Sequence, residues 1–400
     1  MPPFLVPKML NGSNIPYWQP YDSGRLPEYY TWTLNMQRQL PGRFVVEAGY
    51  NAQLGRHLPS NLLSLNQVDP AVFQGFVQQY GAAGAINLMN SRMDSTLARQ
   101  ANIPYPYASF PGSQSVRQAL RPYPQYLDVL TGPDGGERAG RSSYHAFVLK
   151  AEKRYAAGLT FLSSYVFSKT FTLRSDRSNA GDGRAMNTYN REAEKGLSAF
   201  DQTHTIKFNY SYELPFGPDK PYLREGLAAA VLGGWRIAGV HAYASGYPLT
   251  VFPGYSLPLN AGDNRITVLD YDGWRAPIQG DQFNPLVNLW WDPNAFNRTP
   301  VDSVNQLAGY KGGVLRADFG NATVRNPHAR GPCFLNENIS LARSFGIGAT
   351  RFEFRLEVFN LFNRTIWGAP ESTITSANFG KVTTLANAPR QIQLGFRYEF

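Results

Sequence analysis

The 400-residue chain contains one cysteine, Cys333, and only five histidines. One cysteine excludes an intrachain disulfide framework and every metal site that needs several thiolates. The histidines are scattered without the short spacing that a pair of metal ligands on one helix or strand needs. No P-loop and no Gly-x-Ser-x-Gly elbow is present. The sequence therefore predicts no metal site, no cofactor and no catalytic residue.

Charged residues are also scarce, at 17% of the chain against roughly 25% in an average protein. No run of 18 apolar residues occurs, and the longest helix-like apolar piece, 227–232, is far too short to cross a bilayer. The net charge of +9 is spread along the chain rather than gathered in one basic block, which argues against nucleic-acid binding. The N-terminus shows no basic stretch followed by an apolar one, so no signal peptide is visible.

Aromatic residues, by contrast, are abundant, at 14% of the chain, while the mean hydropathy is only −0.34. Low charge, many aromatics and middling hydropathy suit a membrane barrel whose lipid and lumen faces average out along the sequence. A tyrosine-rich secreted all-β protein has the same profile. Composition alone leaves both classes open.

The last eleven residues show the clearest pattern. Side chains of a strand point alternately to its two faces, so the apolar residues here share one face and the polar ones share the other. A C-terminal strand of this kind that ends on Phe is typical of bacterial outer-membrane barrels. It predicts contact with outer-membrane lipid and recognition by the barrel assembly machinery. The residues of this signal are Ile392, Leu394, Phe396, Tyr398 and Phe400.

The same alternation recurs along the whole chain and predicts about nine strands. Each is long enough for a tilted strand to span a membrane, which takes about 9 to 11 residues. No soluble helix shows this period. The clear segments are 30–37, 43–51, 159–168, 205–214 and 351–358, and the weaker ones are 143–155, 234–248 and 333–346.

Charged side chains alternate with the apolar ones in several of these segments. Four charges on one face of 351–358 would be costly in a dry core, but they suit a water-filled lumen. Their role is either a polar channel wall or charge pairing between strands. The charges predicted to face the lumen are Lys169, Lys207, Glu213, Arg351, Glu353, Arg355, Glu357, Arg397 and Glu399.

The connections between the predicted strands alternate in length. Those at 40–42, 155–158 and 346–349 are short, whereas those near 54–142, 173–199, 249–332 and 363–388 are long. Outer-membrane barrels have short periplasmic turns and long outer loops. With the C-terminus in the periplasm, every short turn falls on the periplasmic side. The link 215–234 is of medium length, and we expect a short helix in it at 227–232.

These boundaries predict an extended N-terminal segment, 1–28, followed by a barrel segment, 29–400. Loops of this length without secondary structure are uncommon, so we expect some of them to contain hairpins that extend above the membrane. Trp290 and Trp291 lie in the third long loop. Their ring faces either stack on an extracellular ligand such as a sugar or pack within the loop.

Six segments, in this order, resemble the C-terminal barrel region of TonB-dependent receptors, particularly the Oar-like group. They contain SYHA and EKRY (143–155), LTF and SYVFSK (159–169), FDQTH (200–204), YELPFG (212–217), GGWRIAG and SGYP (233–248) and FRLEVFNLFN (354–363). Each segment alone is weak evidence, whereas the ordered set is specific. The resemblance extends from about residue 20 to the end.

In this family a complete protein has a 22-stranded barrel, an N-terminal plug inside it and a segment that contacts TonB. The resemblance implies import of a bulky ligand, energised through TonB. The present chain has room for about half of those strands, and neither plug nor signal peptide is recognisable in it. We therefore expect an antiparallel transmembrane β-barrel of the outer-membrane type, as an incomplete C-terminal part of a 22-stranded barrel.

Three functional hypotheses follow. The first is the barrel of a TonB-dependent transporter or receptor in a Gram-negative-type outer membrane, with no enzymatic activity. The second is a smaller stand-alone outer-membrane barrel or adhesion scaffold. The third is a soluble all-β carbohydrate-binding protein, which the alternating charges of 351–358 disfavour because a sandwich would bury one face of that strand.

Overall fold

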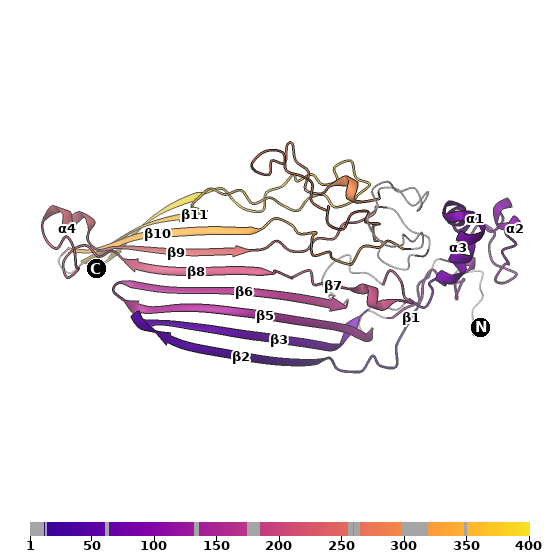
Figure 1. Cartoon of the computed structure of the whole chain (residues 1–400), viewed down its shortest axis with the longest axis horizontal. Coiled ribbons are helices and arrows are strands. Elements are labelled where there is room, and N and C mark those ends of the chain that lie inside the picture. Colours follow the sequence, from indigo (N-terminus) through magenta and orange to yellow (C-terminus); the bar gives the residue numbers. More distant parts are fainter. Residues whose placement is uncertain are drawn as a thin grey trace.

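The computed structural model describes residues 12, 14–60, 64–131, 136–173, 185–254, 259, 265–297, 319–347 and 350–400. One antiparallel sheet dominates this part of the chain (Figure 1). Its long strands, in chain order, are β2 (Glu28–Leu40), β3 (Phe44–Ser60), β5 (Glu137–Ala156), β6 (Leu159–Leu173), β8 (His204–Glu213), β9 (Trp235–Ala244), β10 (Phe334–Ile347), β11 (Thr350–Phe359) and β12 (Gln391–Glu399). The antiparallel β class is thus confirmed, with nine long strands where the alternation predicts about nine.

The strands follow one another across the sheet in chain order. A short strand, β7 (Lys195–Leu197), pairs with β6 beside the start of β8, and β1 (Tyr17–Trp18) pairs with β4 (Leu130–Thr131) in a separate small sheet. Strands β3 and β5 are longer than the sequence predicts, because β3 continues to Ser60 and β5 begins at Glu137. The second connection is correspondingly shorter than the predicted 54–142.

The short connections all lie at one end of the sheet, the turn end, which also carries the C-terminus (Figure 1). Between β5 and β6, Ala157 and Gly158 have φ of 50° and 79°, the left-handed pair that a two-residue hairpin needs. Between β2 and β3 lies a 3₁₀ turn, Pro41–Arg43. The medium link contains helix α4 (Gly226–Leu232), as predicted from its apolar run.

The opposite end, the loop end, carries the long connections and, among the described residues, two large hydrophobic clusters besides a smaller one around Leu173. The first core is built by helices α1 (Pro70–Asn90), α2 (Thr96–Gln100) and α3 (Val116–Ala119). Asp69, Ser95 and Ser115 cap these helices by accepting backbone N–H bonds. The described part of this loop thus contains short helices, and the expectation that some of the long loops contain hairpins stays a prediction. No helix among the described residues is long and apolar enough to cross a membrane.

The second core, here called the aromatic loop core, joins the third and fourth long loops. Its members are Trp274, Trp290, Trp291, Phe296 and Phe379, together with aliphatic neighbours. The rings meet edge to face, with centroids 4.9 Å apart for Trp274 and Phe296 and 5.6 Å for Phe296 and Phe379. The backbone of Trp290 donates a hydrogen bond to the carbonyl of Gly380. Two segments far apart in sequence thus fold as one unit.

The sheet has two edges, β2 and β12. Among the described residues, neither strand pairs with another strand on its outer side. Every neighbouring pair across the sheet is antiparallel. An even number of these pairings separates the two edges, so β2 and β12 run in the same direction. The described sheet is open.

Candidate functional site

One face of the sheet, the apolar face, carries large hydrophobic side chains in register across the strands. Leu34 pairs with Tyr50, Tyr50 with Phe147, and Phe147 with Phe167, in a row across β2, β3, β5 and β6. All four side chains are exposed, Leu34 to 72%. Soluble monomers rarely expose a contiguous apolar surface of this extent. The face fits contact with hydrocarbon.

The C-terminal residues extend this face to the edge of the sheet. In the register of β11 and β12, Phe354 pairs with Phe396, and Phe352 with Tyr398. The ring centroids of these pairs lie 5.2 Å and 4.9 Å apart. Ile392 and Leu394 follow on the same face opposite β11, and Phe400 stands beyond the strand; all five side chains are more than half exposed, Phe396 to 80%.

The other face, the polar face, carries the alternating charges. Arg351 lies opposite Glu399, and Glu353 opposite Arg397. The Arg355 guanidinium lies between two carboxylates of its own strand, at 2.6 Å from Glu353 and 3.7 Å from Glu357, and Arg397 pairs with Glu399 at 2.8 Å. Such exposed pairs stabilise a protein by only about 0–1 kcal/mol each. They make the face polar without making it rigid.

Two further predicted lumen charges lie on this face in β8. Lys207 and Glu213 alternate with Ile206, Phe208 and Tyr212 of the apolar face. Glu213 lies opposite Arg236 in the register. It accepts hydrogen bonds from the Lys220 ammonium at 2.8 Å and the Tyr155 hydroxyl at 3.0 Å. The carboxylate raises the pKa of Lys220, which lies in the link outside the sheet.

Lys169 does not share the polar face, and its assignment to the lumen is corrected by the register. It pairs with His145 and alternates with Ser168 and Thr170, so it points to the same side as Phe167 and Phe171. Its amine reaches the loop end of the sheet, 2.8 Å from the Thr203 hydroxyl and 4.0 Å from the Asp201 carboxylate. The alternation of β6 forbids the predicted side, because Lys169 lies two positions after Phe167 and therefore shares its face.

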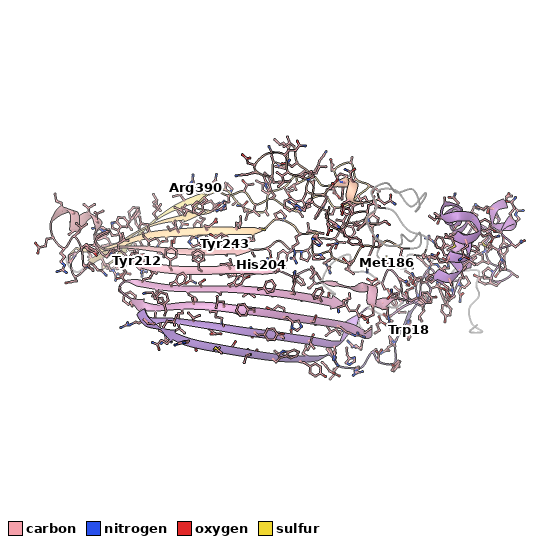
Figure 2. The ribbon with its side chains drawn as sticks, in the orientation of Figure 1. Trp18, Met186, His204, Tyr212, Tyr243 and Arg390 are labelled. Carbon is pink, nitrogen blue, oxygen red and sulfur yellow. The ribbon has the colours of Figure 1, made fainter. Side chains whose placement is uncertain are left out.

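Histidines mark the apolar face toward its loop end. The Tyr50 hydroxyl lies 2.7 Å from Nδ1 of His145, and the Tyr165 hydroxyl lies 2.9 Å from Nδ1 of His204. Figure 2 places Tyr212 near the turn end and His204 toward the loop end of the same strand. The apolar face is therefore bounded by polar, hydrogen-bonded rings. Among the described residues, no group of three or more His, Cys, Asp or Glu side chains could hold a metal ion.

Ion pairs with buried carboxylates join the loops to one another and to the sheet. The Asp201 carboxylate is fully buried and accepts a hydrogen bond from Arg330 Nη2 at 2.5 Å. Glu337, also fully buried, accepts one from Arg364 Nε at 2.8 Å. Two similar pairs join Glu137 to Arg191 and Glu194 to Arg265. Nothing in the local sequence distinguishes these loop residues from solvated ones, so sequence reasoning missed them.

An apolar groove lies where the third and fourth loops meet, and we call it the loop groove. Its cavity volume is about 560 Å³, within the roughly 300–1,000 Å³ of small-molecule sites. Its walls are 285–289 of one loop and 381–385 of the other, with Trp367. Sequence reasoning missed it, although the apolar pair Leu286 and Val287 in a polar loop was an available signal.

Trp290 and Trp291, the predicted ligand contacts, lie inside the aromatic loop core, with exposed fractions of 6% and 0%. The Arg275 guanidinium stacks 3.5 Å from the centroid of the Trp290 ring, and burial lowers the pKa of this guanidinium. The Trp290 indole N–H donates to the Arg330 carbonyl at 3.0 Å. These positions favour packing within the loops over stacking on a ligand.

A family model described as an outer membrane beta barrel domain matches residues 6–393, and the chain therefore belongs to this family. The outer membrane is accordingly its place in the cell. A comparison with curated protein sequences finds no match.

Solved outer-membrane transporters align with the chain at low identity. The transporter YddB of Escherichia coli aligns over 96% of this chain and 34% of its own, at 11% identity and a TM-score of 0.40. The unliganded ferric citrate transporter FecA aligns over 93% of this chain and 31% of its own, at 10% identity and a TM-score of 0.35. The receptor FpvA of Pseudomonas aeruginosa PAO1 bound to pyoverdine aligns over 94% of this chain and 30% of its own, at 11% identity and a TM-score of 0.34. The chain spans about a third of the length of these structures. With TM-scores below 0.5, family membership rests on the family model.

Proposed function

We propose that this chain is the C-terminal barrel portion of a TonB-dependent outer-membrane receptor of the Oar-like type, and that it takes up or binds a bulky ligand at the cell surface. The ordered sequence segments support the family. The exposed apolar face supports contact with lipid, and the charged polar face supports a lumen. A plug and TonB are the proposed partners for energised uptake, and the loop groove is the proposed first contact of the ligand.

The observation that carries this proposal is the direction of the two edge strands. Because β2 and β12 run in the same direction, direct closure between them would join parallel strands. Single-chain outer-membrane barrels of bacteria are antiparallel and have an even number of strands. An odd number of further strands between the two edges gives such a barrel. The sheet is thus suited to a larger barrel with a wide lumen.

The two other hypotheses agree less well with the same geometry. With the strands that the structure describes, a small stand-alone barrel or adhesion scaffold would have to close β2 on β12 in parallel. A soluble carbohydrate-binding protein would have to keep Leu34, Phe396 and their neighbours in water, at a cost of about 25 cal/mol for each Å² of apolar surface. Stable unitary conductance from the chain alone would favour the small barrel instead.

The proposed orientation is tested with one cysteine at each end of the sheet. Leu286 of the loop groove and Leu227 of α4 are matched controls for each other, with exposed fractions of 90% and 86%. The native Cys333, which is exposed, is first replaced by Ser. We expect a membrane-impermeant maleimide to label Leu286→Cys on intact cells and to label Leu227→Cys only after the outer membrane is opened.

Labelling of both cysteines on intact cells, or of neither, would contradict this orientation. Recovery of the native chain in the soluble fraction would reject the membrane proposal itself. Energy coupling is tested separately, since surface binding should persist in cells without TonB whereas uptake should stop.

We also propose that the barrel assembly machinery recognises β12. The strand lies at an edge, and its apolar side chains are exposed along its whole length. Deletion of Phe400 should therefore lower the amount of protein in the outer membrane without changing the message level. Tyr21→Ala, at an equally exposed aromatic residue outside the sheet, is the control and should leave the amount unchanged.

A further inference from the structure

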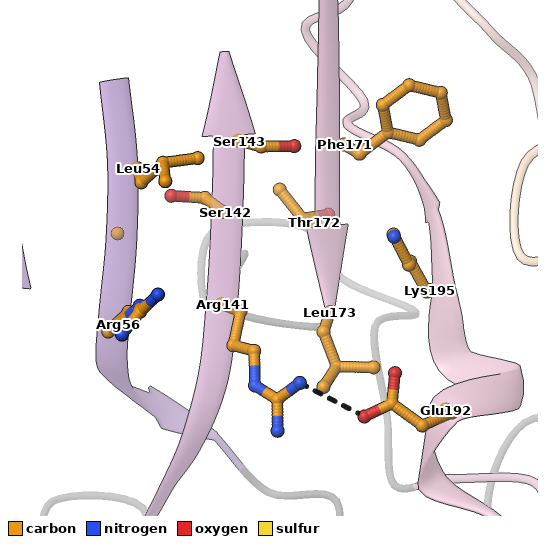
Figure 3. Close-up of a pocket in the computed structure, with 11 residues that line it drawn as sticks. Leu54, Arg56, Arg141, Ser142, Ser143, Phe171, Thr172, Leu173, Glu192 and Lys195 are labelled. Atoms are coloured by element: carbon orange, nitrogen blue, oxygen red, sulfur yellow. Dashed lines mark hydrogen bonds and ion pairs between the residues drawn. The ribbon is translucent and has the colours of Figure 1, made fainter. Parts of the chain in front are cut away.

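A basic pocket opens at the loop end of β3, β5 and β6, between these strands and β7 (Figure 3). Its cavity volume is about 210 Å³, below the roughly 300 Å³ at which sites for whole small molecules begin. Three cationic side chains line it, Arg56, Arg141 and Lys195, and one carboxylate, Glu192. The pocket is separate from the loop groove, which lies in the third and fourth loops.

The register places the three cations on the apolar face. Arg141 pairs with Leu173, and Leu173 with Lys195, so these side chains form one row. Arg56 lies two residues beyond Leu54 on the same face of β3, and its guanidinium contacts the Tyr30 ring 5.6 Å from the centroid. Neighbouring strands are about 4.8 Å apart, so Arg56 and Arg141 stand side by side, and Lys195 lies two strands, about 10 Å, beyond Arg141 in the same pocket.

The pocket carries more positive than negative charge. Arg141 pairs with Glu192 at 3.2 Å, and both side chains are largely exposed. Within the part of the chain that the structure describes, Arg56 and Lys195 form no ion pair. Glu28 lies opposite Arg56 in the register of β2 and β3, and it is already bound by Arg25 at 3.2 Å and by the Tyr30 hydroxyl at 2.9 Å. Like charges on neighbouring strands repel, and a bound anion would relieve this repulsion.

The same pocket has apolar walls. Leu54, Phe171 and Leu173 line it. Leu54 lies in register with Tyr30, toward the loop end of the apolar face. The cations at the loop end therefore lie next to apolar side chains that suit contact with the hydrocarbon of a membrane. A free anion gains nothing from contact with these apolar walls. An amphiphile contacts the cations with its headgroup and the apolar walls with its acyl chains.

We propose that this pocket binds the phosphate of a lipid headgroup in the outer leaflet of the membrane, with the acyl chains lying over Leu54 and Phe171. The two guanidinium groups can hold phosphate oxygens through paired N–H donors, and the Lys195 ammonium adds a point charge. The proposal rests on the proposed orientation, in which the loop end faces outward. It adds a lipid site on the outside of the barrel to a ligand route that runs inside it.

The test uses the complete protein, purified from outer membranes and stripped of lipid in a nonionic detergent. Fluorescently labelled bisphosphorylated lipid A is titrated, and binding is read by anisotropy. We expect Arg56→Gln/Arg141→Gln/Lys195→Gln to bind at least about tenfold more weakly, since each basic residue near an anionic surface is worth roughly a fivefold change in affinity. Arg56→Gln/Lys195→Gln keeps the Arg141–Glu192 pair and should show a smaller loss in the same direction.

The matched control removes three cations from the turn end, in Arg38→Gln/Arg43→Gln/Lys153→Gln. Arg38 and Lys153 lie on the same apolar face, opposite Val46 and Phe44. This control should bind as the parent does, and dephosphorylated lipid A should bind weakly to every variant. Equal loss in the control, or equal binding of the dephosphorylated lipid, overturns the proposal. Displacement by inorganic phosphate as efficient as by unlabelled lipid would show a free-anion site and overturn it too.

A further variant should strengthen binding. Glu192→Gln removes the carboxylate that competes for Arg141, so we expect about a threefold gain in affinity for the phosphorylated lipid, within the effect of one surface charge. Unchanged or weaker binding would contradict the assigned role of Arg141. The cysteine labelling described above reads the orientation independently, so a failure of this lipid site is distinguishable from a failure of the proposed function.

Discussion

The sheet and the loop end solve the same problem, covering apolar side chains, in opposite ways. In the sheet, large residues such as Leu34 and Phe396 stay exposed on the apolar face. At the loop end, Trp274 and Trp291 are buried inside a core of their own. The sheet depends on its surroundings to cover its apolar surface, whereas the loops fold as parts of a soluble protein do. We expect the boundary between them to mark where the membrane ends.

The charged side chains of the two regions differ in exposure, as the apolar side chains do. On the polar face of the sheet, the side chains of Arg355 and Glu353 are 46% and 19% exposed. At the loop end, the Asp201 carboxylate is fully buried beneath Arg330. Exposed pairs are replaceable, but a buried charge that loses its partner is costly. The predicted effects below follow this contrast, from the largest to the smallest.

The largest effect is expected from Arg330→Ala. Its guanidinium donates to the Asp201 carboxylate and to the Asp201 and Gly246 carbonyls, and its loss leaves a buried charge with a distant ammonium, Lys169, at 4.0 Å. We expect the free energy of unfolding to fall by about 3 kcal/mol, as measured by denaturant titration in detergent.

The control for this comparison is Arg355→Ala on the polar face of the sheet. It should lower the free energy of unfolding by less than about 1 kcal/mol. Similar losses in the two variants would show that the loop end is no drier than the polar face, and the contrast between the regions would fail.

The next effect separates the two faces of one strand. Leu341 lies on the apolar face of β10, opposite Leu356, and its neighbour Ser340 lies on the polar face, opposite Glu357. Leu341→Arg should destabilise the barrel by roughly 2–4 kcal/mol if its side chain meets the middle of the bilayer. Ser340→Arg should be nearly neutral. Unfolding in lipid vesicles measures both, and equal effects would reject the assignment of the faces.

The smallest effect is a pH dependence confined to the loop end. The backbone N–H of Thr373 donates to the Glu371 carboxylate at 2.8 Å, and this bond lowers the pKa of Glu371 in the folded protein. A lowered folded-state pKa stabilises the protein above the ordinary pKa of Glu, about 4.3, and this contribution is lost as the pH falls through the folded value. The hydrogen-exchange protection factors of residues 371–381, which are corrected for the intrinsic pH dependence of exchange, should therefore fall below that range, and Glu371→Gln should remove the change.

Much of the sheet was predictable from local sequence. The alternation in 351–358 and 205–214 places β11 and β8 nearly to the residue, because a strand with one face in lipid and one in water repeats its chemistry every second residue. The same rule would have placed Lys169 correctly, since it differs from Phe167 by two residues. The error came from judging Lys169 by its charge instead of by its position.

The loop end was far less predictable. The helices at 70–119 carry no clear amphipathic pattern, and α1 is interrupted at Gly81, with φ of 72°. The aromatic loop core brings Trp291 and Phe379 together from separate connections. Neither local composition nor spacing encodes which loops will meet, so the loop groove was missed, and packing of Trp290 within the loop was only one of two alternatives.

The sequence by itself determined the approximate number and the two-faced character of the strands, because these depend on the period of the backbone and on the chemistry of two solvents. Only the tertiary structure decided which side chains share a row across strands and which loops share a core. It brought Arg56, Arg141 and Lys195 to one pocket, and it set the two sheet edges in the same direction. Register and loop packing join residues distant in sequence, and no local pattern records those contacts.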